Sequence, residues 1–422
     1  MALSAEDPGE TEGNPALASL SRLEAAADAA MNYFYGQLFA MDTEIAAMFP
    51  AAMDVQRQRF FRALARIATE QAQGEASGHA SGQDDLTTYL EHLGRAHRKD
   101  GVRDRHFETF RRALLATLHR FAADVWNDAA QATWEAAFDH AATIMLEAAK
   151  RDEERSPAWW ICTVTSTEPR APGVAVLTLA PDQPLDYLPG QHVSVQTLHW
   201  PRLWRTYSIA NAPRPDGTLS LHVRATNGGL VSNALVHHVA VGDPLVVGAP
   251  AGAMVADTRS ARDVLCLAGG TGLAPIKAII EAITATAPAG PSSACSPDAS
   301  SPGAASPCAA SPGRRREIAL YLGVRYHRDL YDLADLRSME LAYPWLQVIP
   351  AVSDEPARTT LGEQSMHGTV PELAGQASWP GRDVYISGPD EMIIKTVRLL
   401  RELGAPAERM HYDITPETAE AL

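Results

Sequence analysis

Val264-Leu-Cys-Leu-Ala-Gly-Gly-Thr-Gly-Leu-Ala-Pro-Ile-Lys277 is the stretch that decides the fold of the C-terminal part of this chain. Its apolar start is typical of a buried strand, and glycines at 269, 270 and 272 lead into an apolar helix. This order suits a pyrophosphate, because glycines let main-chain N–H groups approach the phosphates and a helix N-terminus carries partial positive charge. A lone glycine loop is weak evidence, so the surrounding segments must support the prediction.

Length and composition narrow the possible classes of protein. With 422 residues, we expect two to four domains with their own cores. The net charge of −15 and the lack of a basic cluster argue against binding to nucleic acid or to an anionic membrane. No stretch approaches about 20 apolar residues, so we expect no membrane span. The N-terminus has no apolar signal core, which predicts a cytoplasmic protein with reduced cysteines.

The residue pattern changes twice along the chain. Residues 16–153 have apolar residues at three- and four-residue steps, which predicts an all-α domain. Residues 157–258 alternate in short runs between turn signals, which predicts a small antiparallel β-barrel. Residues 259–422 alternate between strand and helix patterns, which predicts an α/β domain with a parallel sheet. We expect disorder in residues 1–15 and in the Ala/Ser/Pro-rich insertion 286–315.

Three helical stripes in the first domain each carry one polar residue on an apolar face. Tyr35 follows Leu23, Ala27 and Met31, Gln56 precedes Phe60 and Leu64, and His97 follows Leu86, Leu90 and Leu93. Any one of these could be an ordinary core polar group. Three on successive predicted helices, with Phe49 between the first two, favour a binding site.

These residues lie in segments that resemble a globin: Tyr33-Phe-Tyr-Gly-Gln-Leu-Phe39, Phe49-Pro50, Val55-Gln-Arg-Gln-Arg59 and Leu93–Val102. The match is to the globin half of flavohaemoglobins, and it implies haem b with His97 as the proximal iron ligand. Phe49 would wedge the porphyrin, and Tyr35 and Gln56 would form the distal pair over the gas site. A neutral imidazole supplies the fifth iron bond and leaves the sixth position open.

Several positions depart from the family pattern. A tyrosine and a glutamate commonly support the proximal histidine, but Phe107 and Ala149 stand there, and Ala96 replaces a lysine. We therefore expect the usual hydrogen-bonded support of the imidazole to be absent. In the second half of the chain, Ser387 replaces a cysteine and Thr415 an aromatic residue.

The second half resembles a reductase of the ferredoxin-reductase type, which implies FAD and NADH or NADPH. Arg205-Thr206-Tyr207-Ser208 matches the flavin motif, in which Arg205 would pair with a phosphate, Tyr207 would lie on the ring and Ser208 would bond its polar edge. His192 stands where the family often has tyrosine. The remaining implied cofactor contacts are a second phosphate loop, the nucleotide loop and the nicotinamide segment, namely Gly229, Leu230, Val231 and Ser232, then Gly270, Thr271, Gly272, Leu273, Ala274 and Pro275, then Ser387, Gly388 and Pro389.

A relay explains why these parts share one chain. A nicotinamide gives two electrons as hydride and a haem iron takes one, and a flavin can do both. The resemblance implies a nitric oxide dioxygenase, which converts NO and O₂ to nitrate and takes O₂, NO and NAD(P)H as its small-molecule partners. Two alternatives stay open: a reductase for another acceptor or donor, and an oxygen-binding globin with its own reductase. Tyr326-His-Arg328 does not decide between NADH and NADPH, and the oligomeric state is not indicated.

Overall fold

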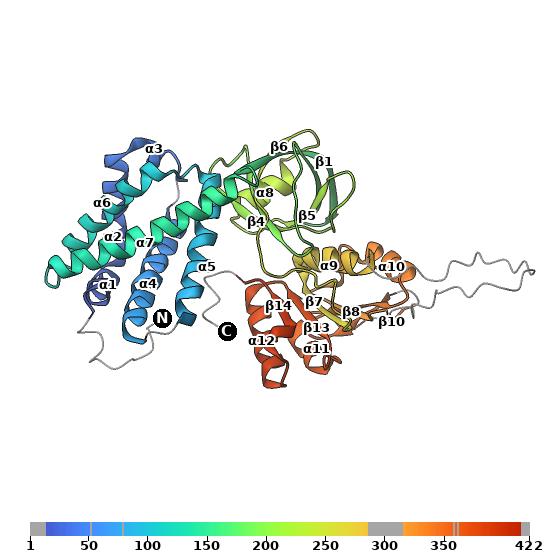
Figure 1. The fold of residues 1–422 in the computed structure, drawn as a ribbon. Helices are drawn as coiled ribbons and strands as arrows, with labels where there is room; N and C mark the ends of the chain where they lie inside the picture. Colours follow the sequence, from blue (N-terminus) through green and yellow to red (C-terminus); the bar gives the residue numbers. More distant parts are fainter. Residues whose placement is uncertain are drawn as a thin grey trace, which may run out of the picture. The chain divides into compact units, whose positions relative to one another are not determined.

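The computed structural model describes residues 14–50, 53–77, 80–285, 315–357, 359–360 and 363–414. The predicted disordered segments 1–15 and 286–315 therefore lie outside the described residues, except at their edges. Pro15 already begins the first helix, so the N-terminal boundary was predicted one residue too late. Arg315 lies with its guanidinium carbon 4.5 Å from the centre of the Trp345 ring, so it belongs to the folded domain. The chain forms two compact units, a helical one and one that holds both large sheets, and each is described by itself (Figure 1).

The helical unit begins where Asn14 accepts hydrogen bonds from the N–H groups of Ala16 and Leu17, with Pro15 at the first position. Its described elements are α1 (Pro15–Ala25), α2 (Ala27–Met41), α3 (Thr43–Ala46), α4 (Asp54–Ser77), α5 (Ala80–His97), η1 (Arg98–Asp100), α6 (Asp104–Phe121) and α7 (Asp128–Glu153). The helix is interrupted at Ala26, between α1 and α2. The first predicted stripe therefore spans two helices, with Leu23 on α1 and its other members on α2.

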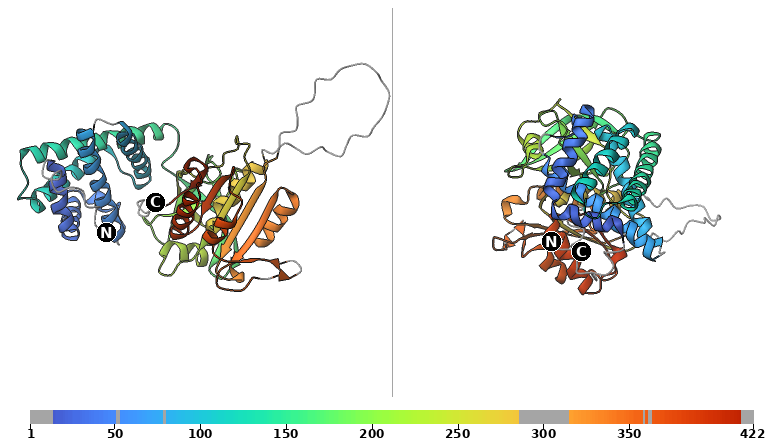
Figure 2. Two further views of the ribbon diagram at one scale, coloured as in Figure 1. Left: turned by 90° about the horizontal axis from the view of Figure 1, so that it is seen from below. Right: turned by 90° about the vertical axis from the view of Figure 1, so that its left-hand side faces the viewer.

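Close packing holds these helices together. Trp134 is buried and its indole N–H donates to Ser19 Oγ at 3.1 Å, which satisfies the polar atom of a core aromatic residue. Helices α5 and α7 approach so closely at Gly94 that a Cβ there would lie 2.1 Å from the carbonyl oxygen of Met145. Figure 2 shows the helices of this unit from two further directions.

The first sheet of the second unit is a nearly closed antiparallel barrel. Its strands are β1 (Trp159–Ala171), β2 (Val174–Pro181), β3 (His192–Thr197), β4 (Arg205–Ser208), β5 (Leu219–Arg224) and β6 (Pro244–Gly248), in the order β4-β3-β6-β1-β2-β5. A bridge between Ile209 and Leu221 joins the two edges of this order. Helix α8 (Leu230–His237) follows β5. Alternate residues such as Val193 and Val195 fill the interior.

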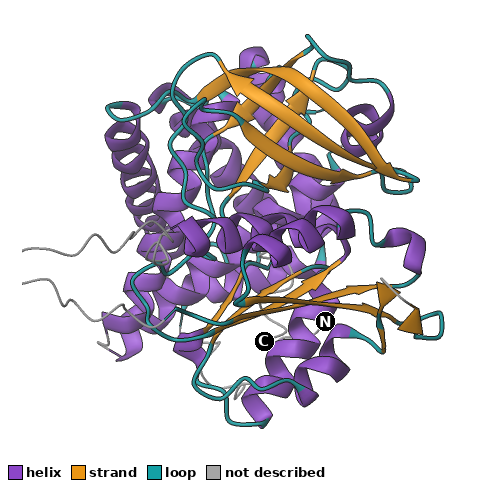
Figure 3. Cartoon of the chain, turned by 90° about the vertical axis from the view of Figure 1, so that its right-hand side faces the viewer, coloured by secondary structure: helices purple, strands orange, loops and turns teal. Residues whose placement is uncertain are grey.

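The second sheet is parallel, with strand order β12-β9-β8-β7-β13-β14. One face is covered by α9 and α10 and the other by α11 and α12 (Figures 1 and 3). The elements are β7 (Val264–Gly269), η2 (Gly270–Gly272), α9 (Leu273–Ala285), β8 (Ile318–Val324), η3 (His327–Asp329), α10 (Leu333–Ala342), β9 (Leu346–Val352), β10 (Thr359–Thr360), β11 (Glu363–Gln364), β12 (Met366–His367), α11 (Val370–Gln376), β13 (Asp383–Ser387), α12 (Asp390–Glu402), η4 (Ala407–Arg409) and β14 (Met410–Tyr412). The predicted order of a helical domain, a barrel and a parallel α/β domain is confirmed. Within the described residues, no helix is both long and apolar enough to cross a bilayer.

A buried charged network joins the barrel to the parallel-sheet domain. The fully buried carboxylate of Asp332 lies 2.7 Å from Lys277 Nζ on α9 and 3.5 Å from Arg170 Nη1 on β1. Beside it, His222 Nδ1 of β5 lies 2.8 Å from the hydroxyl of Tyr331. Such a network is stabilising only while every charge keeps its partner, so it fixes how the two domains of this unit are arranged.

Burial lowers the pKa of His222 to about 4, because the desolvated imidazole resists protonation. In the unfolded chain the ordinary value is about 6.5, so between about pH 6.5 and 4 the unfolded state binds more protons. Acid should therefore reduce the free energy of unfolding across that window, by about 3 kcal/mol at most. Urea unfolding of the holoprotein, followed by flavin fluorescence, should show a flatter pH dependence for His222→Gln than for the wild type. The exposed His367→Gln serves as control, and equal slopes for His222→Gln and wild type would contradict the prediction.

Candidate functional site

The glycine loop lies at the carboxyl end of β7, where the neighbouring strand β13 also ends. A Cβ at Gly272 would lie 2.5 Å from the main-chain nitrogen of Gly388 and from the carbonyl carbon of Ser387. Gly270 has φ +55° and Gly388 has φ +157°, conformations that side chains rarely adopt. The structure therefore brings the predicted pyrophosphate loop and the predicted nicotinamide segment into direct main-chain contact.

The rest of the nucleotide loop forms the first turn of α9. Leu273, Ala274 and Pro275 are buried, whereas Gly270, Thr271 and Gly272 of η2 are partly exposed and can face a ligand. A helix start with small residues and main-chain N–H groups fits a pyrophosphate. The fit rests on the close approach of the backbone at Gly272, where a Cβ has no room, and on the left-handed conformation of Gly270.

The flavin motif forms the edge strand β4, which pairs with β3. Burial raises the pKa of Tyr207 to about 12, against a smaller opposite effect of the Arg205 charge, so the phenol stays protonated. Arg205 is exposed and its Nη1 donates to the Trp204 carbonyl at 2.8 Å. An aromatic ring beside an exposed guanidinium on one strand fits a ring system that carries a phosphate.

The predicted second phosphate loop is stabilised by hydrogen bonds between its own residues. Ser232 Oγ accepts from the Thr226 N–H at 3.2 Å and lies 3.0 Å from Thr226 Oγ1. A Cβ at Gly229 would lie 2.2 Å from Thr226 Oγ1, so the loop requires glycine there. No side chain caps the first turn of α8, which begins at Leu230. Sequence reasoning identified Ser232 but missed its partner Thr226, because no motif signals that contact.

His192 is the first residue of β3 and pairs across the sheet with Ser208. Its Nδ1 lies 3.7 Å from Asp413 Oδ2, which comes directly after β14. Sequence reasoning missed Asp413, because nothing in its neighbourhood marks a residue that reaches a different domain. Thr415 lies outside the described residues.

In the globin unit, Tyr35, Phe49 and Gln56 come together. The centre of the buried Tyr35 ring lies 5.5 Å from that of Phe49 and 6.1 Å from that of Phe60. Its hydroxyl donates to the main-chain carbonyl of Gln56 over 3.5 Å. Burial raises the pKa of Tyr35 well above its usual value, so the phenol keeps its proton. Among the described residues this O–H makes one long hydrogen bond, so it remains able to donate to a ligand on the distal side.

His97 is the last residue of α5 and is half-buried. Its Nδ1 lies 2.7 Å from the Leu93 carbonyl oxygen. A carbonyl only accepts, so Nδ1 carries the hydrogen and Nε2 of the neutral ring has a free lone pair. That is the tautomer that an iron ligand needs, so the residue fits haem.

Other residue types stand at the two positions where the family commonly supports the proximal histidine. The Phe107 ring lies 6.4 Å from Phe138, and Glu147 is exposed, 3.8 Å from Arg151. The hydrogen-bond partner of the imidazole is thus a main-chain carbonyl.

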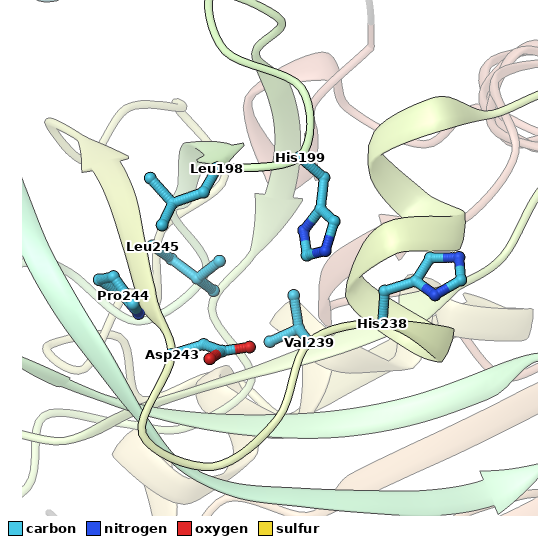
Figure 4. A pocket seen from close by; sticks show the side chains of 7 residues that line it. All are labelled: Leu198, His199, His238, Val239, Asp243, Pro244 and Leu245. Carbon is cyan, nitrogen blue, oxygen red and sulfur yellow. The ribbon is translucent and has the colours of Figure 1, made fainter.

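A hollow of about 340 Å³ lies on the barrel at the end of β3 (Figure 4). It is lined by Leu198, His199, His238, Val239, Asp243, Pro244 and Leu245. The rings of His199 and His238 are 5.9 Å apart, and the Asp243 carboxylate accepts from the Ala240 N–H. None of the predicted site residues lines this hollow.

Comparisons with known proteins identify three domains. The globin family matches residues 32–145, the oxidoreductase FAD-binding domain matches 163–255 and the oxidoreductase NAD-binding domain matches 266–398. The chain is therefore an oxidoreductase that combines a haem-binding globin with FAD- and NAD-binding domains. It is a fusion of the flavohaemoglobin type.

Individual relatives are similar to part or all of this chain. The chain is 28% identical over 276 residues to a flavohemoprotein of Bordetella pertussis, covering 61% of this chain and 67% of that protein. It is 29% identical over 246 residues to the electron transfer component of a xylene/toluene monooxygenase of Pseudomonas putida, covering 57% and 61%. The matches thus span 61–67% of the length of these two relatives. A flavohemoglobin from Malassezia yamatoensis, solved with FAD and haem bound, shares the fold with a TM-score of 0.69 at 14% identity, over 94% of this chain and 98% of that one.

The contact at Gly272 generates a prediction. Gly272→Ala should force the loop away from Ser387, and a displacement of about 1 Å can slow a reaction about a hundredfold. Anaerobic stopped-flow should show flavin reduction by NAD(P)H slowed to that extent with the FAD content unchanged. Gly375→Ala is the control, since its Cβ would meet only the Leu399 side chain at 3.3 Å. Unchanged reduction rates in Gly272→Ala would contradict the assignment of this loop.

Proposed function

We propose that this chain oxidises nitric oxide to nitrate with O₂, using electrons that pass from NAD(P)H through FAD to haem. Two NO and two O₂ with one NAD(P)H would give two nitrate ions, NAD(P)⁺ and one proton. The observation that carries the proposal is the His97 Nδ1–Leu93 bond, which leaves Nε2 free for iron, in a chain that also holds the reductase domains. When bound, nicotinamide supplies hydride, flavin exchanges electrons in pairs or singly, and haem iron takes one electron and binds diatomic gas.

The residues of the chain have separate tasks in this proposal. His97 would hold the iron, and Phe49 would pack against the porphyrin. Tyr35 and Gln56 would face the gas site, where a buried phenol O–H would stabilise negative charge by about 1.5–3 kcal/mol. Phe60 and Leu64 exclude water from that side.

In the reductase domains, Tyr207 and Ser208 orient the flavin, and Arg205 and the 229–232 turn hold its phosphates. Residues 270–275 hold the nicotinamide pyrophosphate, and Ser387–Pro389 place the nicotinamide. The contact between Gly272 and Gly388 brings these two segments together, which supports hydride transfer at this edge of the sheet.

A second function is favoured by two observations. Matched relatives include electron-transfer components of aromatic oxygenase systems, and the proximal imidazole here lacks the support common in flavohaemoglobins. A reductase that serves another acceptor would turn over NAD(P)H with quinones or ferredoxins at a rate independent of haem content.

Tyr35→Phe tests the distal assignment. Loss of 1.5–3 kcal/mol should speed O₂ dissociation from the reduced protein about tenfold to a hundredfold, because each 1.4 kcal/mol corresponds to a factor of ten. Stopped-flow absorption measures this rate, and nitrate yield after addition of NO measures the reaction. Tyr33→Phe is the matched control on α2, since its ring contacts Phe121 and Arg120 instead. An unchanged O₂ dissociation rate in Tyr35→Phe, or no nitrate from wild type, would contradict the proposal.

A further inference from the structure

Asp413 links the last strand of the parallel sheet to the barrel. Its Oδ1 accepts from the main-chain N–H groups of Ala253 at 3.0 Å and Met254 at 3.2 Å. Its Oδ2 lies 3.7 Å from His192 Nδ1, and both side chains are 28% exposed. One carboxylate therefore holds a barrel loop and faces an imidazole.

Gly252 shows that this arrangement is built to a close fit. Its φ is +109°, and a Cβ there would lie 2.5 Å from Asp413 Oδ2 and 2.9 Å from His192 Nδ1. Only glycine therefore leaves room for the carboxylate and the imidazole to meet. The Nδ1 and Cε1 atoms of His192 face this glycine.

The pair lies next to the flavin motif. His192 and Ser208 are directly opposite each other on β3 and β4, and opposite residues of paired strands project to the same face. His192 also bridges to Ala251, so the loop that carries Gly252 follows the strand end. Three elements thus meet at His192: β4, the 251–254 loop and the residue after β14.

We propose that His192 accepts the proton released when electrons leave the flavin, with Asp413 as its positioning residue; this rests on FAD binding at Arg205–Ser208. NAD(P)H delivers two electrons and one proton as hydride, and two ferric haems take one electron each. One proton per NAD(P)H is left over and must leave the flavin. It forms an N–H bond on Nε2 of His192 and passes to solvent through the exposed part of the ring.

The surroundings of His192 suit this task. An imidazole gains and loses protons near neutral pH more readily than other side chains. Asp413 is the charged group that faces it in the described structure, while β4 presents the neutral Ser208 and the 251–254 loop presents main chain. At 3.7 Å the carboxylate lies beyond hydrogen-bond distance of Nδ1, and its negative charge stabilises the imidazolium.

The test uses the full chain loaded with haem and FAD. His192→Gln keeps a polar side chain of similar reach but cannot carry the proton. In anaerobic stopped-flow with NAD(P)H, flavin reduction should stay within about twofold, and the later haem reduction should slow about a hundredfold, the size of a lost general base. Asp413→Asn should slow the same phase less. His237→Gln, an exposed histidine on α8, serves as control.

Two further readouts separate proton transfer from a structural role. Added imidazole should restore haem reduction in His192→Ala but not in Asp413→Asn. In a plot of the flavin midpoint potential against pH, the wild type should show a change of slope. The His192→Gln variant should show no such change. If His192→Ala loses FAD, the potentials of His192→Gln decide the question.

The outcomes are distinct from those of the proposed function. Wild type that binds no FAD, or whose haem NAD(P)H does not reduce, would refute the proposed function. Wild type that works, with unchanged haem reduction and an unchanged potential profile in His192→Gln, would refute the role of His192 alone.

Discussion

The hydrogen bond between His97 Nδ1 and the Leu93 carbonyl is the interaction on which the globin half depends. It lies within one turn of α5, so the helix itself sets the tautomer. This contact uses neither of the polar residues that the family pattern has at Phe107 and Ala149. In the proposed haem site, the acceptor behind the imidazole is therefore a main-chain carbonyl, which is less basic than a carboxylate.

In the reductase half, close approaches of glycine main chain to neighbouring atoms limit which residues fit at the predicted cofactor sites. Gly272 against Gly388, Gly229 against Thr226 and Gly252 against Asp413 are three close approaches that a Cβ would block. Each lies at a predicted cofactor position or next to one. The buried ion pair of Asp332 with Lys277 and the contact of Arg170 hold the barrel and the parallel sheet in one arrangement, so these edges stay aligned.

Periodicity and turn residues predicted the order of domains, and the motifs predicted which strand ends carry the site. These features are local, so one segment of sequence contains them. The contacts that were not predicted are those that no motif signals. Asp413 beside His192 and the network around Asp332 join residues far apart in the chain, and Thr226 contacts Ser232 across a loop. The interruption of the helix at Ala26 was also not predicted, because alanine is the strongest helix former and gives no sign of a helix end.

Anaerobic addition of NAD(P)H to the purified chain tests the central claim most directly. The absorption spectrum should first show a ferric Soret band with flavin shoulders, then loss of the flavin bands, and then the shift of the Soret band to its ferrous position. Reduction of the flavin with a Soret band that stays ferric, or a purified chain without any Soret band, would contradict an electron path from nicotinamide to an iron held by His97.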